Sequence, residues 1–253
     1  MDTENLDRRM RRLRAYNAIM GLLHALQGVA ILAIANDFTL PVTATFMEGP
    51  PGTDPGAAET LLDVRIAWGV AAFVFVSAIA HWLIASPGVF AWYRRNLERN
   101  RNYARWIEYS VSASIMIVLI AMLTGIGDVA ALVALFGVNA SMIWFGLLQE
   151  RYEDPGGSML AFWLGCLAGA VPWIAIGIYL VSPGNDASPP GFVYGIFVSL
   201  FLFFNSFALN MWLQYRRVGP WRSYLFGESA YVLLSLVAKS ALAWQVFAGT
   251  LAP

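Results

Sequence analysis

Long apolar stretches separated by short polar connections dominate the pattern along this chain. Seven stretches are long enough to cross a bilayer, because a helix needs about 20 apolar residues to span the hydrocarbon core. They cover the ranges Tyr16–Ala35, Ile66–Ala85, Ala104–Thr124, Val129–Leu148, Met159–Val181, Phe192–Leu213 and Leu225–Ala248. Turn signals rich in Gly and Pro punctuate the connections at Gly49–Gly52, Asp154–Gly157, Ser182–Gly184 and Pro189–Gly191. The pattern predicts an all-α membrane protein, a bundle of seven transmembrane helices forming one domain over residues 1–253.

The composition supports this interpretation. Of the 253 residues, 58% are hydrophobic and 13% are charged, whereas soluble domains have about 25% charged residues. These values exclude a disordered chain, a nucleic-acid binder and an ordinary soluble enzyme. The single cysteine, Cys166, excludes an internal disulfide and a cysteine-based metal site. Because Cys166 lies in an apolar run, we interpret it as a packing residue.

The basic residues predict the orientation of the chain in the membrane. With seven spans, all sixteen Lys and Arg residues except Arg65 and Lys239 fall in the same half of the protein as the N-terminus. The positive-inside rule then places the N-terminus in the cytoplasm and the C-terminus outside. We therefore expect a multi-pass protein of the cell membrane, in contact with its lipids. The longest connection, residues 36–63, is expected outside as an ordered lid or contact surface.

The only lysine, Lys239, lies near the middle of the last span. A charged side chain there costs about 2.5–3.5 kcal/mol on insertion scales, so a mid-membrane lysine indicates a function. One such function is a Schiff base with an aldehyde, because lysine is a primary amine whose protonation changes readily on burial. The alternative is a structural ion pair with a buried carboxylate.

Glu108 on the third span is the clearest carboxylate partner for Lys239. It lies one to two turns inside the cytoplasmic end of its helix, and the Cα–Cβ bond of Lys239 tilts towards that same end. Ser235, four residues before the lysine, shares its helix face and can hydrogen-bond either group, although it could instead bond to its own helix carbonyl. Glu228 lies three turns below Lys239, and we expect it in water at the membrane edge.

The only two histidines, His24 and His81, also lie within spans, in the half that holds Glu108. They predict a polar cluster able to take up a proton; the alternative is that they are ordinary helix–helix hydrogen-bonding residues. Their spacing does not match a metal site. The opposite halves of the helices are nearly free of titratable groups: Leu119, three turns past Glu108, is apolar. A proton pump needs such groups on both sides of its switch.

Seven helices with Lys239 in the last, Glu108 on the third, Ser235, the two histidines and a cytoplasmic N-terminus resemble the heliorhodopsin family over the whole chain. The resemblance implies all-trans retinal as cofactor, bound to Lys239 as a protonated Schiff base with Glu108 as the sole counterion. It implies light-driven isomerisation to 13-cis and proton movement through His24 and His81 without net transport. It further implies a slow, non-enzymatic photosensor with an unidentified signalling partner, and a homodimer contacted through the first outer loop.

Inward-facing side chains near the lysine are expected to line the retinal pocket. The candidates are Tyr109 and Ser112 on the third span, a stripe of Asn139, Met142, Ile143 and Gly146 on the fourth, Trp163 and Trp173 on the fifth, and Phe203, Phe207 and Asn210 on the sixth. Aromatic stripes of this kind also serve helix packing or interface belts. Two other functions remain open. One is a light-driven pump or light-gated channel on the same chromophore, and the other is a small-solute transporter that uses the Lys239–Glu108 pair.

Overall fold

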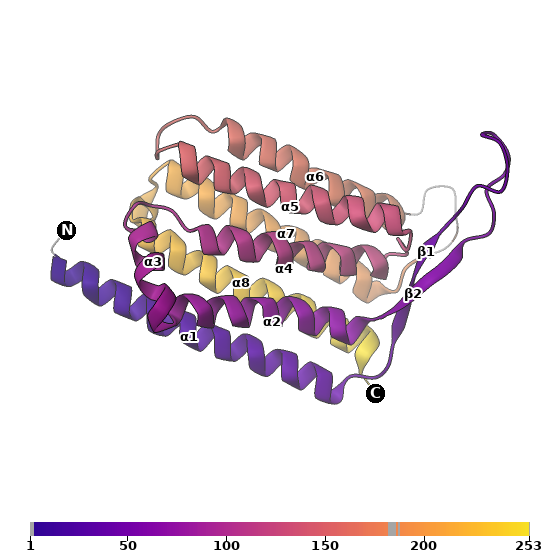
Figure 1. Ribbon diagram of the computed structural model, residues 1–253, viewed down its shortest axis with the longest axis horizontal. Helices are drawn as coiled ribbons and strands as arrows, with labels where there is room; N and C mark the ends of the chain where they lie inside the picture. The colour runs from indigo at the N-terminus through magenta and orange to yellow at the C-terminus, as the bar shows by residue number, and fades with distance from the viewer. Residues whose placement is uncertain (1–2, 182–185, 187, 253) are drawn as a thin grey trace.

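The computed structural model describes residues 3–181, 186 and 188–252, which form a bundle of long helices with a small hairpin at one end (Figure 1). In chain order the elements are α1 Thr3–Ile34, β1 Thr39–Ala44, β2 Glu59–Arg65, α2 Ile66–Ala85, α3 Pro87–Leu97, α4 Tyr103–Leu123, α5 Val129–Tyr152, α6 Leu160–Val181, α7 Gly191–Tyr215, a 3₁₀ turn Gly219–Arg222, α8 Tyr224–Val246 and a π turn Phe247–Leu251. Within the described residues, seven helices are long and apolar enough to cross a membrane, α3 being the exception. The predicted turn at Ser182–Gly184 lies outside the described residues.

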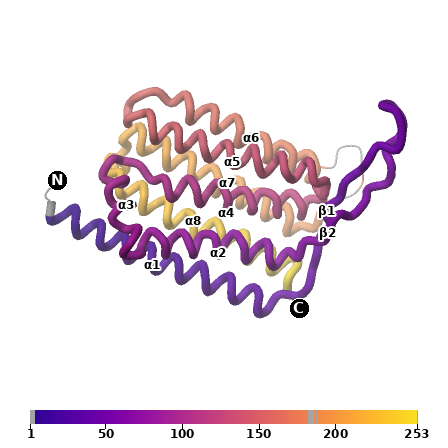
Figure 2. Tube along the Cα trace, in the orientation of Figure 1, coloured from indigo at the N-terminus to yellow at the C-terminus, as the bar shows by residue number. Residues whose placement is uncertain are grey.

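The seven long helices lie side by side, and the bundle has two distinct ends (Figure 2). α1 packs along α2, α2 along α4, α4 along α5, α5 along α6, and α7 along α8. The short helix α3 and the N-terminus mark one end, called the α3 end below. The β1–β2 hairpin and the C-terminus mark the other, called the hairpin end. These two ends differ in chemistry, which positions the site.

Helical structure at the α3 end extends beyond the predicted spans. α1 begins at Thr3 rather than at Tyr16, and α3 was not predicted. The extension is stabilised because Met10 and Leu13 on α1 are buried against Tyr93 and Leu97 on α3. α3 itself starts with Pro87 at its first position, where the missing N–H group of proline costs nothing. Tertiary burial thus adds helix that the hydropathy of a membrane span alone does not predict.

The connection between α1 and α2 is ordered, and it contains the only strands in the described part of the chain. β1 pairs antiparallel with β2, with an irregularity between Val42 and Thr43. The N–H group of Thr43 donates to the carbonyl of Gly127 at 2.8 Å, which ties the hairpin to the turn between α4 and α5. A small two-stranded sheet is thus added to the predicted all-α bundle of seven helices, which the structure confirms.

The hairpin half of the bundle holds an apolar core. Side chains from α1, α2, α4 and α8 meet there without exposure, including Ile31, Phe73, Ile117, Ile120 and Leu242. Because lipid is as apolar as this core, close van der Waals packing rather than removal from water holds these side chains together. The polar and charged buried side chains described below lie in the middle of the bundle and towards the α3 end.

Candidate functional site

Lys239 on α8 and Glu108 on α4 form a buried ion pair. The Nζ atom of Lys239 donates to Oε1 of Glu108 at 3.1 Å and to Oγ of Ser235 at 2.8 Å. Ser235 precedes Lys239 by one turn on the same face, so the lysine stem runs back towards the α3 end to reach both oxygens. The stem thus bridges the difference in depth between Lys239, near the middle of its span, and Glu108, nearer the α3 end of its own.

Ser77 on α2 is a second hydrogen-bond donor to the Glu108 carboxylate. Its hydroxyl donates to Oε1 of Glu108 at 2.6 Å, and its side chain is fully buried. Ser77 was not predicted from the sequence. The available signal was its position four residues before His81, which places both side chains on one face of α2. A hydroxyl donor at this distance stabilises the ionised carboxylate in an apolar surrounding.

The two histidines are stacked next to this pair. The rings of His24 on α1 and His81 on α2 lie with centroids 5.6 Å apart at an interplanar angle of 11°. Nδ1 of His81 lies 2.7 Å from Oδ1 of Asn17, a buried residue that the sequence analysis did not single out. Both ring nitrogens of His24 are buried and have no hydrogen-bond partner among the described residues. The arrangement brings two proton-accepting rings together in the same half of the bundle as Glu108.

A second buried charge cluster lies closer to the α3 end. The Arg105 guanidinium pairs with Glu228 and, at 2.6 Å, with Glu150, and it lies over the rings of Trp106 and Tyr231. Glu228 is fully buried, so the prediction that it is solvated at the membrane edge is wrong. The cause is tertiary: the first turns of α4 and α8 and the last turns of α5 close around it.

A small cavity with several polar side chains in its wall lies between the two charge clusters. It has a volume of about 40 Å³, and its walls include Asn17, His81, Glu108, Arg105 and Glu228. A cavity of this size beside several polar groups has room for at least one water molecule. The polar groups therefore form a continuous region from Lys239 towards the α3 end.

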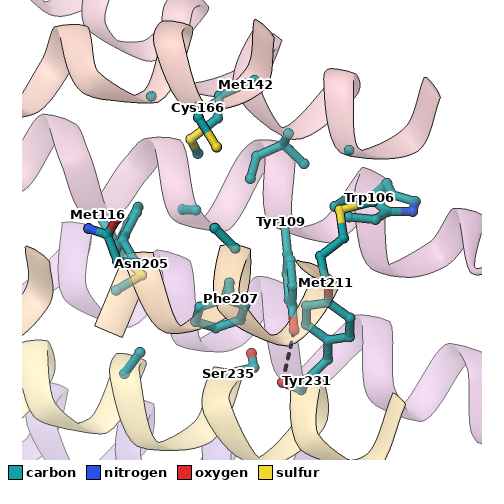
Figure 3. A pocket seen from close by; sticks show the side chains of 18 of the residues that line it. Trp106, Tyr109, Met116, Met142, Cys166, Asn205, Phe207, Met211, Tyr231 and Ser235 are labelled. Carbon is teal, nitrogen blue, oxygen red and sulfur yellow. Dashed lines mark hydrogen bonds between the residues drawn. The ribbon is translucent and has the colours of Figure 1, made fainter. Parts of the chain in front are cut away.

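A larger, mainly apolar cavity of about 280 Å³ lies on the other side of Lys239, between α4, α5, α6, α7 and α8 (Figure 3). Of the residues predicted to line a pocket, Lys239, Ser235, Tyr109, Met142, Ile143, Gly146, Trp173 and Phe207 border it. Further large side chains at its walls were missed, namely Trp106, Met116, Phe162, Phe204, Met211 and Tyr231. Gly146 lacks a side chain where a Cβ atom would overlap the ring of Trp106.

Five predicted pocket residues do not border the cavity: Ser112, Asn139, Trp163, Phe203 and Asn210. Trp163 is 54% exposed on the outer face of α6. The Asn139 amide donates instead to Ser114 at 3.0 Å, and Asn210 accepts from the Trp221 indole at 2.7 Å. The sequence stripes were chosen without knowledge of how far each helix is rotated about its axis.

Cys166, which we interpreted as a packing residue, borders the same cavity. Three small residues of α6 border the cavity with it, namely Gly165, Gly169 and Ala170. Among the described residues, no group of three or more His, Cys, Asp or Glu side chains is placed to hold a metal ion.

The cavity fits the retinal that the sequence resemblance implies. Its walls are aromatic and aliphatic, which suits an apolar polyene, and its polar groups are few. Lys239 borders it and supplies the primary amine that an aldehyde requires. Glu108 is within hydrogen-bond distance of that amine and can balance its positive charge.

Comparison with solved structures shows the same fold in two microbial rhodopsins. The light-driven proton pump rhodopsin of Coccomyxa subellipsoidea is 16% identical with a TM-score of 0.65, covering 94% of this chain and 96% of that one. Cyanorhodopsin from the cyanobacterium Tolypothrix sp. NIES-4075 is 12% identical with a TM-score of 0.59, covering 99% and 96%. At these identities the likeness is one of fold.

A search of curated protein sequences finds no significant match to this chain. The sequence pattern of a known family, in contrast, matches residues 13–251, which contain every helix described above except the part of α1 before Leu13. This pattern agrees with the seven apolar helices and with the rhodopsin fold. The chain belongs to the heliorhodopsin family, and it is a multi-pass, seven-helix retinal protein of the membrane.

Proposed function

We propose that this protein is a light sensor that carries all-trans retinal on Lys239 and completes its photocycle without net ion transport. The observation that carries the proposal is the position of Nζ of Lys239. It lies at the wall of a 280 Å³ apolar cavity and 3.1 Å from a single carboxylate, that of Glu108. An amine at an apolar cavity with a paired anion is the arrangement that a charged, covalently held chromophore requires.

When bound, retinal supplies absorption of visible light and a light-driven isomerisation from all-trans to 13-cis. The residues around Lys239 control the proton at Nζ. Glu108 holds that proton through its negative charge, while Ser77 fixes the carboxylate from the side of α2. Ser235 accepts a second hydrogen bond from Nζ and so orients it.

A proton released from Nζ has a polar route in one direction. Glu108 and His81 border the same small cavity, and His81 stacks on His24, whose ring nitrogens are buried without described partners. A neutral imidazole can accept a proton at its unprotonated ring nitrogen. We infer that this cluster stores the proton during the photocycle and returns it along the same route.

The opposite direction offers no comparable route among the described residues. Between Lys239 and the hairpin end the buried side chains are mainly those of the apolar core around Phe73, Ile117 and Leu242, and none of the described ones is charged. Moving an isolated charge through such a region costs several kcal/mol without a polar path. This asymmetry supports proton exchange with storage rather than pumping.

The distribution of arginines supports a cytoplasmic α3 end, and an outer hairpin end, in the cell membrane. We further propose that the protein acts as a homodimer in which the β1–β2 hairpin contributes to the contact. Light-induced changes at Glu108 and the histidines would then be read on the cytoplasmic side by an unidentified signalling partner.

A visible absorption spectrum of the full chain, expressed and supplied with all-trans retinal, tests the proposal. We expect a visible band that disappears when hydroxylamine is added under illumination, because hydroxylamine captures the aldehyde from the lysine. In sealed vesicles, illumination should produce no sustained pH change. Absence of the band from folded protein would refute the retinal site, and a steady proton current would refute the sensor assignment in favour of a pump or channel.

A further inference from the structure

The large cavity reaches the outer surface of the bundle between α6 and α7. Three of the residues at its wall are also exposed on the lipid-facing side, namely Ala170 on α6 and Phe201 and Asn205 on α7. Phe201 is 42% exposed. At this level α6 presents only the small side chain of Ala170 to the cavity wall and the outer surface. Part of a ligand in the cavity therefore lies at an opening in the side of the bundle, away from the water at the two ends of the bundle.

Asn205 is the polar residue at this opening. Its Nδ2 atom donates to the carbonyl of Phe201, one turn earlier in its own helix, at 2.8 Å. Within the described residues, Oδ1 has no hydrogen-bond partner. Buried asparagines elsewhere in the bundle bond to other helices, as Asn139 does to Ser114. Polar side chains in membrane helices are normally used in this cross-helix way, so Asn205 presents an unused acceptor to the cavity and the lipid.

The remaining walls near Asn205 are apolar. Met116, Phe204 and Trp173 surround this part of the cavity, and Trp173 contacts Phe204 edge to face. Figure 3 shows the amide end of Asn205 beside Met116 and apart from Ser235, the neighbour of Lys239. In a ligand whose aldehyde end is attached to Lys239, the part next to Asn205 is therefore not the aldehyde end.

We propose that Asn205 makes the cavity selective for retinoids whose ring carries a hydroxyl group. This inference rests on the proposed retinal function and specifies its ligand. A ring hydroxyl donates a hydrogen bond to Oδ1 of Asn205. This bond satisfies both the hydroxyl and the amide oxygen, neither of which finds a partner in hydrocarbon. A ring without oxygen fills the same space but leaves the acceptor unused. One net hydrogen bond contributes about 0.5–1.5 kcal/mol, which corresponds to about a two- to tenfold preference.

A competition experiment tests this selectivity. The full-length apoprotein in nanodiscs receives equal amounts of all-trans retinal and all-trans 3-hydroxyretinal, with 4-hydroxyretinal in a parallel sample, and the bound retinoids are extracted and quantified. We expect the hydroxylated form of at least one pair to be enriched about two- to tenfold. Asn205→Leu should bring that ratio close to one. Ser206→Ala is the matched control, because Ser206 neighbours Asn205 but bonds its own helix at Leu202 and does not border the cavity.

A second measurement removes the covalent bond from the comparison. In Lys239→Ala protein, binding of retinol and 3-hydroxyretinol is followed by quenching of tryptophan fluorescence, since Trp106 and Trp173 border the cavity. The hydroxylated alcohol should bind more tightly by a similar factor, and adding Asn205→Leu should abolish the difference.

Equal uptake of both retinoids, or a preference that persists in Asn205→Leu, would overturn this inference while leaving the retinal function intact. Failure of the folded protein to take up either retinoid would overturn the proposed function, and this inference with it.

Discussion

Lys239 and Glu108 are separated by 131 positions in the sequence, yet Nζ of the lysine lies 3.1 Å from Oε1 of the glutamate inside the bundle. Neither charge could be buried alone, because an unpaired ion in an apolar interior costs several kcal/mol. Each charge offsets the cost of burying the other, and together the two residues place a protonated amine beside an apolar cavity.

Replacing Lys239 by alanine should give a protein that stays colourless when all-trans retinal is added, because no other lysine exists in the chain. The substitution also leaves Glu108 unpaired, so we expect a loss of stability of about 3–5 kcal/mol. Lys239→Ala combined with Glu108→Gln removes both charges and serves as the folding control. A visible band in either variant would contradict attachment at Lys239.

Glu108→Gln should weaken the visible band at neutral pH and increase absorption in the near ultraviolet. The amide carries no charge and cannot balance a cation at Nζ, whereas added halide should restore part of the band by supplying an anion. Absorption spectra with and without halide measure this effect. Glu98→Gln, at the exposed residue that follows α3, is the control and should behave as the unmodified protein. Identical spectra for Glu108→Gln would assign the charge balance to another carboxylate.

The double substitution His24→Ala with His81→Ala should change the rate of the proton step without creating transport. It removes the two stacked rings near Glu108 but leaves the apolar core at the hairpin end in place. Flash spectroscopy with a pH-indicator dye measures the step, and pH recording in illuminated vesicles measures transport. Unchanged kinetics would show that the proton does not reach the histidines.

A buried and a partly exposed ion pair of this chain should differ strongly in how much they contribute to the free energy of unfolding. Glu228→Gln leaves the buried Arg105 with one carboxylate fewer and should destabilise the protein by about 3–5 kcal/mol. Asp7→Asn breaks the pair of Asp7 with Arg94, whose side chains are 42% and 35% exposed, and should cost at most about 1 kcal/mol. Thermal unfolding in the same detergent compares the two variants. Equal losses would mean that the Arg105 cluster contributes no more than a surface pair.

Tyr93 should make the protein less stable in strongly alkaline solution. Burial on α3 raises the pKa of its phenol from about 10 to about 12. Because the folded protein holds this proton more tightly than the unfolded chain, the stabilising contribution is complete below pH 10 and is lost as the pH rises towards 12. Two pH units correspond to roughly 3 kcal/mol.

Tyr93→Phe tests this contribution, since it removes the ionising group while keeping the ring. Its unfolding temperature should fall less than that of the unmodified protein between pH 10 and pH 12, and Tyr152→Phe, at an exposed position, should make no difference. Parallel curves for Tyr93→Phe and the unmodified protein would contradict the role of Tyr93.

Hydropathy alone predicts most of the fold. The membrane spans are long apolar runs, and a helix is the structure that satisfies its own backbone hydrogen bonds in lipid, so seven runs predict seven helices. Lys239 and Glu108 were predictable for a related reason. Charged side chains within such runs are costly and stand out individually.

Tertiary structure decides which side chains meet. Glu228 lies at the start of an apolar run, where sequence predicts solvent, yet the packing of α4, α5 and α8 buries it against Arg105. Trp163 and Trp173 looked alike in the sequence, but the rotation of α6 exposes Trp163 and places Trp173 at the cavity. A helix that is apolar on all faces carries no signal for its rotation, because lipid and protein interior are both apolar. Only the contacts with neighbouring helices set that rotation, and with it the walls of the cavity.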